Sequence, residues 1–286
     1  MSFSAVYNQI IILFSLIIVG YVCGKLEVIT KEMVKNFTTF ILQVASPALI
    51  IGGMIIPRTP EKLKASIAIL IISFSIYGGS LIFGKLITKI IRPNQSQGGI
   101  FEFSLVFSNV VFMGFPVLQT VFGKEAIFYA AIYNIAFNIL VYTVGIALVS
   151  TQKETHKINF KAFINPGAIA SIVGFIIFVL AIPVAGVIKG VMNLVGSVTT
   201  PLSMLVIGAM LSALPLSKMF NNWRIYVVSL LRVLVLPLIV YGLLKFVFKI
   251  DNMMLVGVPV IVTAMPVAAN AALMVQEYGS EPGIAS

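Results

Sequence analysis

The stretch Ile18-Val19-Gly20-Tyr21 recurs 154 positions later as Ile172-Val173-Gly174-Phe175. At the same offset, Ala45-Ser46-Pro47 recurs as Thr199-Thr200-Pro201. Short matches of this kind are weak one by one. Because the two matches share one offset, they indicate that the chain contains a duplicated unit.

The composition is that of a membrane protein. Hydrophobic residues make up 59% of the 286 residues and charged residues only 10%, and the mean hydropathy of +1.09 is far above that of soluble domains. A helix needs about 20 apolar residues to cross a bilayer. Backbone polar groups in lipid must find hydrogen bonds within their own segment, so we expect the spans to be helices. We predict an all-α polytopic membrane protein with spans near residues 5–24, 36–56, 65–87, 101–122, 126–150, 164–184, 192–214, 225–248 and 253–276.

The duplication and the spans together predict an inverted repeat. One repeat holds five spans, and because five is odd, the second repeat enters the membrane from the opposite side. The first five-helix repeat is expected at residues 1–150 and the second at 151–286. The offset puts the partner of span 126–150 at about residues 282–305. We therefore expect the tenth helix to be absent from this chain, and the second repeat to be incomplete with four helices.

The positive net charge is better explained by contact with the membrane surface than by binding to nucleic acid. Nineteen Lys and Arg against nine Asp and Glu give a formal charge of +10, and the cations lie mostly in short connections, where they set orientation and touch anionic lipid. The odd-numbered connections hold Lys25, Lys31, Lys35, Lys85, Lys89, Arg92, Lys153, Lys157, Lys161, Lys218 and Arg224. The even-numbered ones hold Arg58, Lys62, Lys64, Lys124, Lys189, Lys245 and Lys249. This bias predicts a cytoplasmic 151–161 loop and an external N-terminus in a multi-pass protein of the cell membrane.

Two expected helices carry breaks in their middles. The fourth span contains Asn109, Gly114 and Pro116, and the ninth contains Pro266 and Asn270. Proline removes an internal hydrogen bond and clashes with the preceding turn, so backbone polar groups are freed at membrane depth. A single proline kink is usually a packing feature, but two kinks with an Asn nearby, in corresponding spans, favour a substrate site at half-helix N-termini. The prolines themselves do not superpose, because at an offset of 156 Pro266 falls on Val110.

Motifs along the whole chain resemble those of the auxin efflux carrier family of membrane transporters. The motifs are Asn109 to Gly123 with Lys124-Glu125-Ala126, Gly20-Tyr21 through Leu26, Ser46-Pro47-Ala48-Leu49-Ile50, Asn165-Pro166, Pro201-Leu202, Ile207 to Leu211, Met265 to Asn270, and Tyr278-Gly279. The resemblance implies ten helices in two inverted repeats, with helices 4 and 9 crossing at their broken middles, and efflux of organic anions. The family usually has a small residue where this chain has Val111. The short fifth connection indicates a compact, prokaryotic-type member, for which auxin is a poor guess as substrate.

Three further charged residues are candidates for anion binding or coupling. Arg232 lies within the eighth span, where an unpaired Arg costs about 2.5–3.5 kcal/mol on insertion scales, so it either binds an anion or reaches the headgroups. Glu102 opens the fourth span and Glu277 closes the ninth. Either carboxylate is able to carry a coupling proton, although carboxylates at the membrane surface are usually just solvated.

These features favour a secondary carrier over other classes. An enzyme is disfavoured because the single His156 lies far in sequence from the single Cys23, and no metal-ligand cluster appears. A sodium- or proton-coupled antiporter or symporter of related inverted-repeat fold would use intramembrane carboxylates, which the middles of the spans lack. A non-transporting membrane receptor stays open. We expect a small organic anion such as a carboxylate as substrate and membrane lipids as partners, without cofactor, metal or nucleic acid, and we leave a homodimer open.

Overall fold

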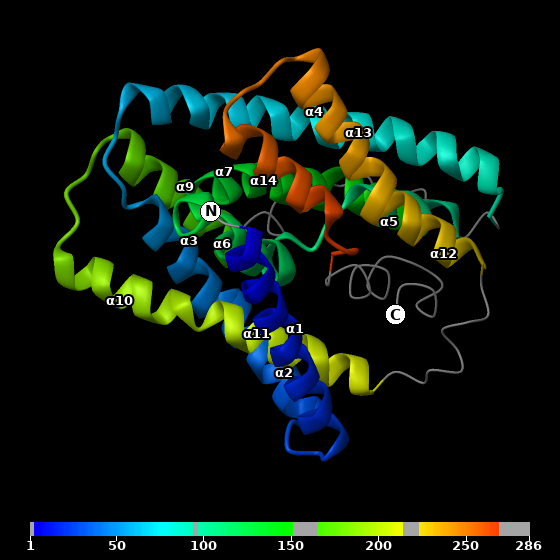
Figure 1. Cartoon of the computed structure of the whole chain (residues 1–286), viewed down its shortest axis with the longest axis horizontal. Helices are drawn as coiled ribbons and strands as arrows, with labels where there is room; N and C mark the ends of the chain where they lie inside the picture. The colour runs from blue at the N-terminus through cyan, green and yellow to red at the C-terminus, as the bar shows by residue number, and fades with distance from the viewer. Residues whose placement is uncertain (1–2, 94–96, 151–164, 214–222, 269–286) are drawn as a thin grey trace. The chain divides into compact units, whose positions relative to one another are not determined.

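The computed structural model describes residues 3–93, 97–150, 165–213 and 223–268 (Figure 1). Apart from one isolated β-bridge, regular structure in these residues is helical. The α-helices are α1 (Phe3–Lys25), α2 (Lys31–Phe40), α3 (Ser46–Met54), α4 (Pro60–Ile91), α5 (Gly98–Val106), α6 (Phe115–Phe122), α7 (Glu125–Leu140), α8 (Ile146–Val149), α9 (Pro166–Val179), α10 (Gly186–Ser197), α11 (Thr199–Ser212), α12 (Trp223–Leu230), α13 (Leu236–Gly242) and α14 (Met253–Ala264). The π-helical segments are η1 (Ile41–Ala45), η2 (Val110–Gly114), η3 (Val141–Gly145), η6 (Leu231–Val235) and η7 (Leu243–Val247).

Three of the π-helical segments have a shared cause in the sequence. Segments η1, η2 and η6 each end two residues before a proline, which are Pro47, Pro116 and Pro237. Proline has no N–H to offer the carbonyl four residues earlier, and its ring clashes with that carbonyl. A wider π turn just before the proline relieves the clash, so the helix continues instead of breaking.

The apolar helices of the structure fall on the nine expected spans. By length and composition, five helical stretches of the described residues are able to cross a membrane: Lys31–Met54, Pro60–Ile91, Glu125–Val149, Gly186–Ser212 and Trp223–Val247. Shorter apolar helices lie at Ile10–Lys25, Val110–Phe122, Pro166–Val179 and Met253–Ala264. The protein is therefore an all-helical membrane-embedded protein, as predicted.

Several span boundaries differ from the sequence prediction by about one helical turn: the second span begins at Lys31 rather than at 36, and the third runs over Pro60–Ile91 rather than 65–87. Two further differences have a clear cause. The seventh span begins at Gly186 rather than at 192, because α10 and α11 form one nearly continuous helical stretch. The sixth span ends at Val179 rather than at 184, because Ala181 adopts a left-handed conformation (φ 50°) and Pro183 follows two residues later. A left-handed residue followed by proline is a common way to end a helix.

The described helices belong to two compact units. The first unit comprises Met1–Leu63, Val111–Ala131 and Pro166–Asn221, and the second comprises Lys64–Val110, Ile132–Asn165 and Asn222–Ser286. Each unit therefore draws on both halves of the sequence.

Close backbone contact organises the first unit. A Cβ on Gly20 of α1 would collide with the backbone of Leu205 on α11, and a Cβ on Gly208 would collide with the backbone of Ile17 and Tyr21. Helices α1 (dark blue in Figure 1) and α11 consequently pack at a distance that only glycine permits. Likewise α9 packs on α3, where Gly174 faces Met54.

Two apolar clusters hold the second unit together. In one, Ile91 of α4 packs with Phe101 and Leu105 of α5 and with Val228 of α12. In the other, Val240, Leu244 and Val256 join α13, η7 and α14, and Ile72 and Ile76 of α4 pack against them. Helix α4 thus contacts both the α5 side and the α14 side of this unit.

Candidate functional site

The broken fourth and ninth spans are joined to each other inside the second unit. The backbone N–H of Asn109 donates to the carbonyl oxygen of Pro266 at 2.8 Å, and the N–H of Ala268 donates to the carbonyl oxygen of Phe107 at 3.0 Å. Between these two bonds, Ser108 and Val267 form an antiparallel β-bridge. Two short extended segments therefore lie antiparallel where each helix is interrupted.

Local sequence explains one break better than the other. Met265 is extended (ψ 149°) because the ring of Pro266 disfavours a helical conformation in the residue before it. Phe107 is also extended (ψ 114°), yet the nearest proline downstream is Pro116. The backbone bonds to the ninth span compensate for the helical hydrogen bonds that residues 107–109 give up.

The guanidinium of Arg232 fills the point where the two interrupted helices end. Its Nε donates to the carbonyl oxygen of Met265 at 3.0 Å, and its Nη1 donates to the carbonyl oxygens of Ser104 and Leu105 at 2.8 and 2.6 Å. Its Nη2 donates to the hydroxyl of Ser108. Arg232 is only 1% exposed, so these acceptors replace water as its partners.

This arrangement has a clear electrostatic reason. The accepting carbonyls belong to the last turn of α5 and to the residue just after α14, where helix carbonyls have no partner in their own helix. Each helix C-terminus carries about half a negative charge from the macrodipole. Two such ends around one guanidinium balance its charge, which lets an arginine remain buried at this depth.

The position of Arg232 decides, in one respect, between the two alternatives for where its side chain ends. Arg232 does not extend to the headgroups, because its side chain is buried among backbone carbonyls. The helix ends whose carbonyls accept from Arg232 are C-termini, those of α5 and α14. The N-terminal end in this region that the structure describes is the start of η2 at Val110.

Aromatic side chains enclose the break in the fourth span. The ring of Phe107 lies 4.8 Å from that of Phe103, 5.9 Å from that of Tyr77 on α4, and 6.0 Å from that of Phe137 on α7, measured between centroids. Tyr133 of α7 lies 5.5 Å from Tyr77. These contacts pack the extended segment against α4 and α7, so the position of the crossing is fixed by aromatic packing.

The structure brings some of the predicted site residues together. Asn109 and Pro266 meet at the crossing through their backbones, and Asn109 is buried at 8% exposure. Gly114 and Pro116 belong to η2 and α6 of the first unit. The helix does not break there, because the π turn absorbs the proline, and the interruption lies at residues 107–109 instead. Asn270 lies outside the described residues.

The two candidate carboxylates are not part of the crossing so far as the structure describes them. Glu102 is half-buried on α5 and accepts a 2.9 Å hydrogen bond from the Thr88 hydroxyl of α4. Glu277 lies outside the described residues. Among the residues that the structure does describe, no group of His, Cys, Asp and Glu side chains is arranged to hold a metal ion.

Several buried polar residues of the second unit were missed by sequence reasoning. Ser108 binds Arg232, and Asn134 and Asn138 are buried one turn apart on α7. Asn138 accepts a 3.1 Å hydrogen bond from the Asn165 amide. A polar pair four residues apart in the middle of an apolar span is a signal of a buried polar face, and it was available in the sequence.

Comparison with known protein families identifies the family of the chain. A family model described as "Membrane transport protein" matches residues 5–286, which is nearly the whole chain. A search of curated proteins found no match. The match over nearly the full length, together with the apolar helices, makes this chain a member of the membrane transport protein family, which is the auxin efflux carrier family.

Proposed function

We propose that this membrane transporter is a secondary carrier that exports small organic anions such as carboxylates. In this proposal the substrate binds near the crossing of the fourth and ninth spans, and the site is exposed alternately to the two sides of the membrane. Asn109 and Asn270 supply hydrogen bonds, and the interrupted backbone at residues 107–109 and at Pro266 shapes the site. The protein is expected in the cell membrane with its N-terminus outside.

The observation that carries the proposal is the buried charge of Arg232. No carboxylate among the described residues forms an ion pair with it, and its charge is met only by backbone carbonyls and the Ser108 hydroxyl. At an effective dielectric constant of about 20, a unit charge about 8 Å away changes the energy of an ion by about 2 kcal/mol. A fixed cation at the crossing therefore favours an anion nearby and disfavours a second cation.

The same residue argues against a coupling ion held by these carbonyls. Carbonyl oxygens at broken helices coordinate sodium in some transporters. Here the carbonyls of Ser104, Leu105 and Met265 are already taken by Arg232. The guanidinium acts as a permanent internal cation, and Glu102 and Glu277 stay as the candidates for proton coupling.

Packing in the first unit supports the inverted repeat of 1–150 and 151–286. At an offset of 154, Gly20 corresponds to Gly174 and Met54 corresponds to Gly208. Gly20 and Gly208 lie in the contact between α1 and α11, and Gly174 and Met54 lie in the contact between α9 and α3. A two-fold relation between repeats produces such a pair of contacts, because each helix meets the partner of the other.

Helix ends give a second line of support. The non-glycine residues with positive φ in the described chain are Glu27, Arg92, Ala181 and Lys249. Glu27 and Ala181 are 154 residues apart, and Arg92 and Lys249 are 157 apart, close to the offset of the repeat. Left-handed residues are uncommon outside glycine, so their recurrence at one spacing favours a duplicated fold.

The test begins with a thermal-shift screen of carboxylic acids on the purified chain, because a ligand that binds the folded state raises its apparent stability. The acid that stabilises the protein is then followed as a radiolabelled solute into sodium-free proteoliposomes. The proposal predicts uptake that unlabelled acid on the opposite side accelerates. Binding without flux would indicate a receptor, and uptake that requires sodium would indicate a sodium-coupled carrier.

A further inference from the structure

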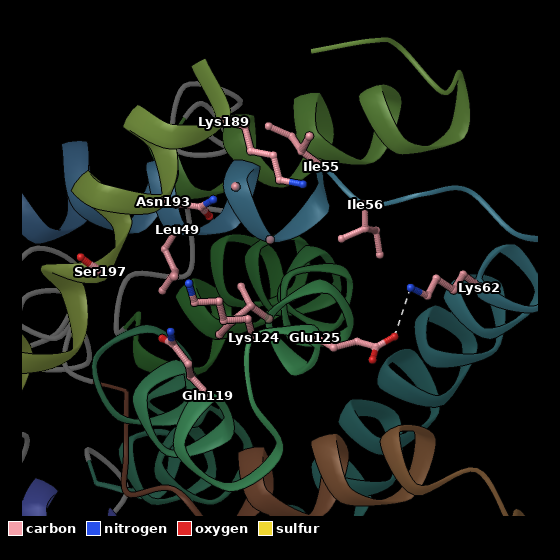
Figure 2. Close-up of a pocket in the computed structure, with 13 residues that line it drawn as sticks. Leu49, Ile55, Ile56, Lys62, Gln119, Lys124, Glu125, Lys189, Asn193 and Ser197 are labelled. Carbon is pink, nitrogen blue, oxygen red and sulfur yellow. Dashed lines mark ion pairs between the residues drawn. The ribbon is translucent and has the colours of Figure 1, made fainter. Parts of the chain in front are cut away.

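A pocket of about 310 Å³ opens in the first unit, and none of the residues that form the crossing lines it. Its wall is made by α3, α6, α10 and the start of α7, and the first turn of α4 closes one end (Figure 2). The volume is at the lower end of the range of about 300–1,000 Å³ in which proteins hold small molecules. Its lining is unusual for this apolar chain, because it gathers three lysines with several neutral polar side chains.

The three lysines come from separate connections of the chain. Lys62 lies in the first turn after the second connection, Lys124 lies in the fourth connection, and Lys189 lies in the first turn after the sixth connection. Even-numbered connections lie on one side of the membrane when every span crosses it. The pocket therefore belongs to one face of the transporter, that of the even-numbered connections.

The charge in the pocket is not neutralised. Lys62 pairs with Glu125 at 3.2 Å, whereas Lys124 and Lys189 have no carboxylate partner in the part of the chain that the structure describes. Three lysines and one glutamate leave a lining charge of +2. The N-termini of α4, α7 and α10 lie at the same place, since Lys62, Glu125 and Lys189 all fall in the first turns of these helices. Helix N-termini add further positive potential.

Neutral hydrogen-bonding groups are arranged beside these charges. Figure 2 shows the side chains of Gln119, Lys124 and Asn193 converging on one side of the pocket, with the Lys62–Glu125 pair on the other. Leu49, Ile55 and Ile127 add apolar surface to the lining. This combination of amides, ammonium groups and an apolar patch fits a small oxyanion with a short hydrocarbon body.

We propose that this pocket is a binding site for one carboxylate or phosphate group, held by Lys124 and Lys189 with help from Asn193 and Gln119. The site is separate from the crossing and stands whether or not the transported solute is an anion. Two sources supply such a group: a free organic or inorganic anion, and the phosphate of an anionic lipid headgroup. Both place the oxyanion between the two lysines.

The test measures how fast individual lysines of the full chain are acetylated, by mass spectrometry. Succinate and inorganic phosphate are the probes, in neutral detergent at constant ionic strength set with sodium chloride. A probe at about ten times its Kd leaves about one tenth of the sites free, so acetylation of Lys124 and Lys189 should slow up to about tenfold. Lys64 is the internal control, because it is exposed on α4 two residues from Lys62 and does not line the pocket.

Two variants test whether the lysines act together, and nanodiscs of different lipids distinguish a free anion from a lipid headgroup. In Lys124→Gln, the probe should protect Lys189 much less, whereas Lys64→Gln should leave protection intact; both side chains are exposed, so neither change disturbs the fold. Protection by succinate or phosphate in detergent identifies a free anion as occupant. Protection only in phosphatidylglycerol nanodiscs, and not in phosphatidylcholine nanodiscs, identifies a headgroup. If neither the probes nor the anionic lipid slowed the acetylation of Lys124 and Lys189 more than that of Lys64, the proposal would be overturned and the lysines would be merely solvated.

Discussion

The backbone N–H of Asn109 and the carbonyl oxygen of Pro266, 157 residues apart in sequence, are joined by a hydrogen bond of 2.8 Å. This bond and its neighbour from Ala268 to Phe107 turn two interrupted helices into one joined crossing. Arg232 completes the crossing by binding the carbonyls that both helix ends leave free. The account of function depends on this arrangement.

The first prediction concerns the stability contributed by Arg232. Arg232→Met should leave the carbonyls of Ser104, Leu105 and Met265 buried without donors, and each buried unsatisfied group costs about 1–3 kcal/mol. We expect a loss of about 3 kcal/mol or more in unfolding free energy, measured in detergent. Arg232→Lys should recover only part, because one ammonium cannot reproduce the guanidinium fork.

The matched control for that experiment is Arg224→Met. Arg224 lies on the same helical stretch but is only half-buried, and its Nε donates to the carbonyl oxygen of Ile91 at 3.5 Å. Water can therefore replace a half-buried side chain as a hydrogen-bond partner, which it cannot do at Arg232. Replacement of Arg224 should cost far less than that of Arg232. Equal costs for the two substitutions would mean that Arg232 has no special role at the crossing.

The second prediction tests the crossing by a covalent bond. Ser108 and Val267 face each other between the two backbone hydrogen bonds, as a pair that does not itself share hydrogen bonds. Such pairs have Cα atoms about 4.5 Å apart, which is within the range for a disulfide. In a Cys23→Ser background, Ser108→Cys with Val267→Cys should form a disulfide on mild oxidation, seen as a cross-linked peptide.

A shifted pair supplies the control for the cross-link. Ser104→Cys with Val267→Cys places one cysteine a full helical turn earlier, on α5. Cross-linking of this pair but not of the first would show that the extended segments are not aligned as described.

The third prediction concerns the α1–α11 contact. Gly20→Val should separate the two helices, because even a Cβ at this position would collide with the Leu205 backbone. We expect the unfolding free energy to fall by about 1–3 kcal/mol or more, which is the cost of overpacking a core. Gly78→Ala on α4 has open space around it and should be neutral, or stabilising by up to about 1 kcal/mol. Thermal unfolding in detergent separates these outcomes. Similar melting temperatures for both variants would contradict the close contact.

The fourth prediction is the orientation of the chain. The loop holding Lys153, Lys157 and Lys161, which lies outside the described residues, should be cytoplasmic. Single cysteines placed there in a Cys23→Ser background should resist an impermeant maleimide in intact cells, and a cysteine replacing Lys189 should react. The reverse pattern would invert the topology.

Sequence reasoning located the apolar spans well because hydropathy is a local property. It also named Asn109 and Pro266, since a proline in an apolar run signals freed backbone groups wherever it folds. It placed the fourth break at Gly114 and Pro116, and that was wrong. The π turn η2 accommodates Pro116, whereas residues 107–109 are held extended by partners that lie 157 and 161 residues away.

Arg232 was visible in the sequence but its role was not. An insertion scale assigns a cost to an arginine by depth alone, and cannot include carbonyls that two other segments bring to it. The same holds for the lysine pocket, since Lys62, Lys124 and Lys189 read as ordinary connecting residues until the first unit folds. Interactions of this kind depend on tertiary structure and leave no periodic pattern.

The most direct test of the central claim is calorimetric binding of the acid found by the thermal-shift screen, compared across four variants of the chain. If the anion binds at the crossing, Asn109→Ala and Asn270→Ala should each weaken affinity by about 1–3 kcal/mol, the value of a hydrogen bond to a charged group. Glu102→Gln, away from the crossing, and Lys64→Gln, on the surface, should leave affinity nearly unchanged. Unchanged affinity in both Asn variants would place the anion elsewhere and contradict the account.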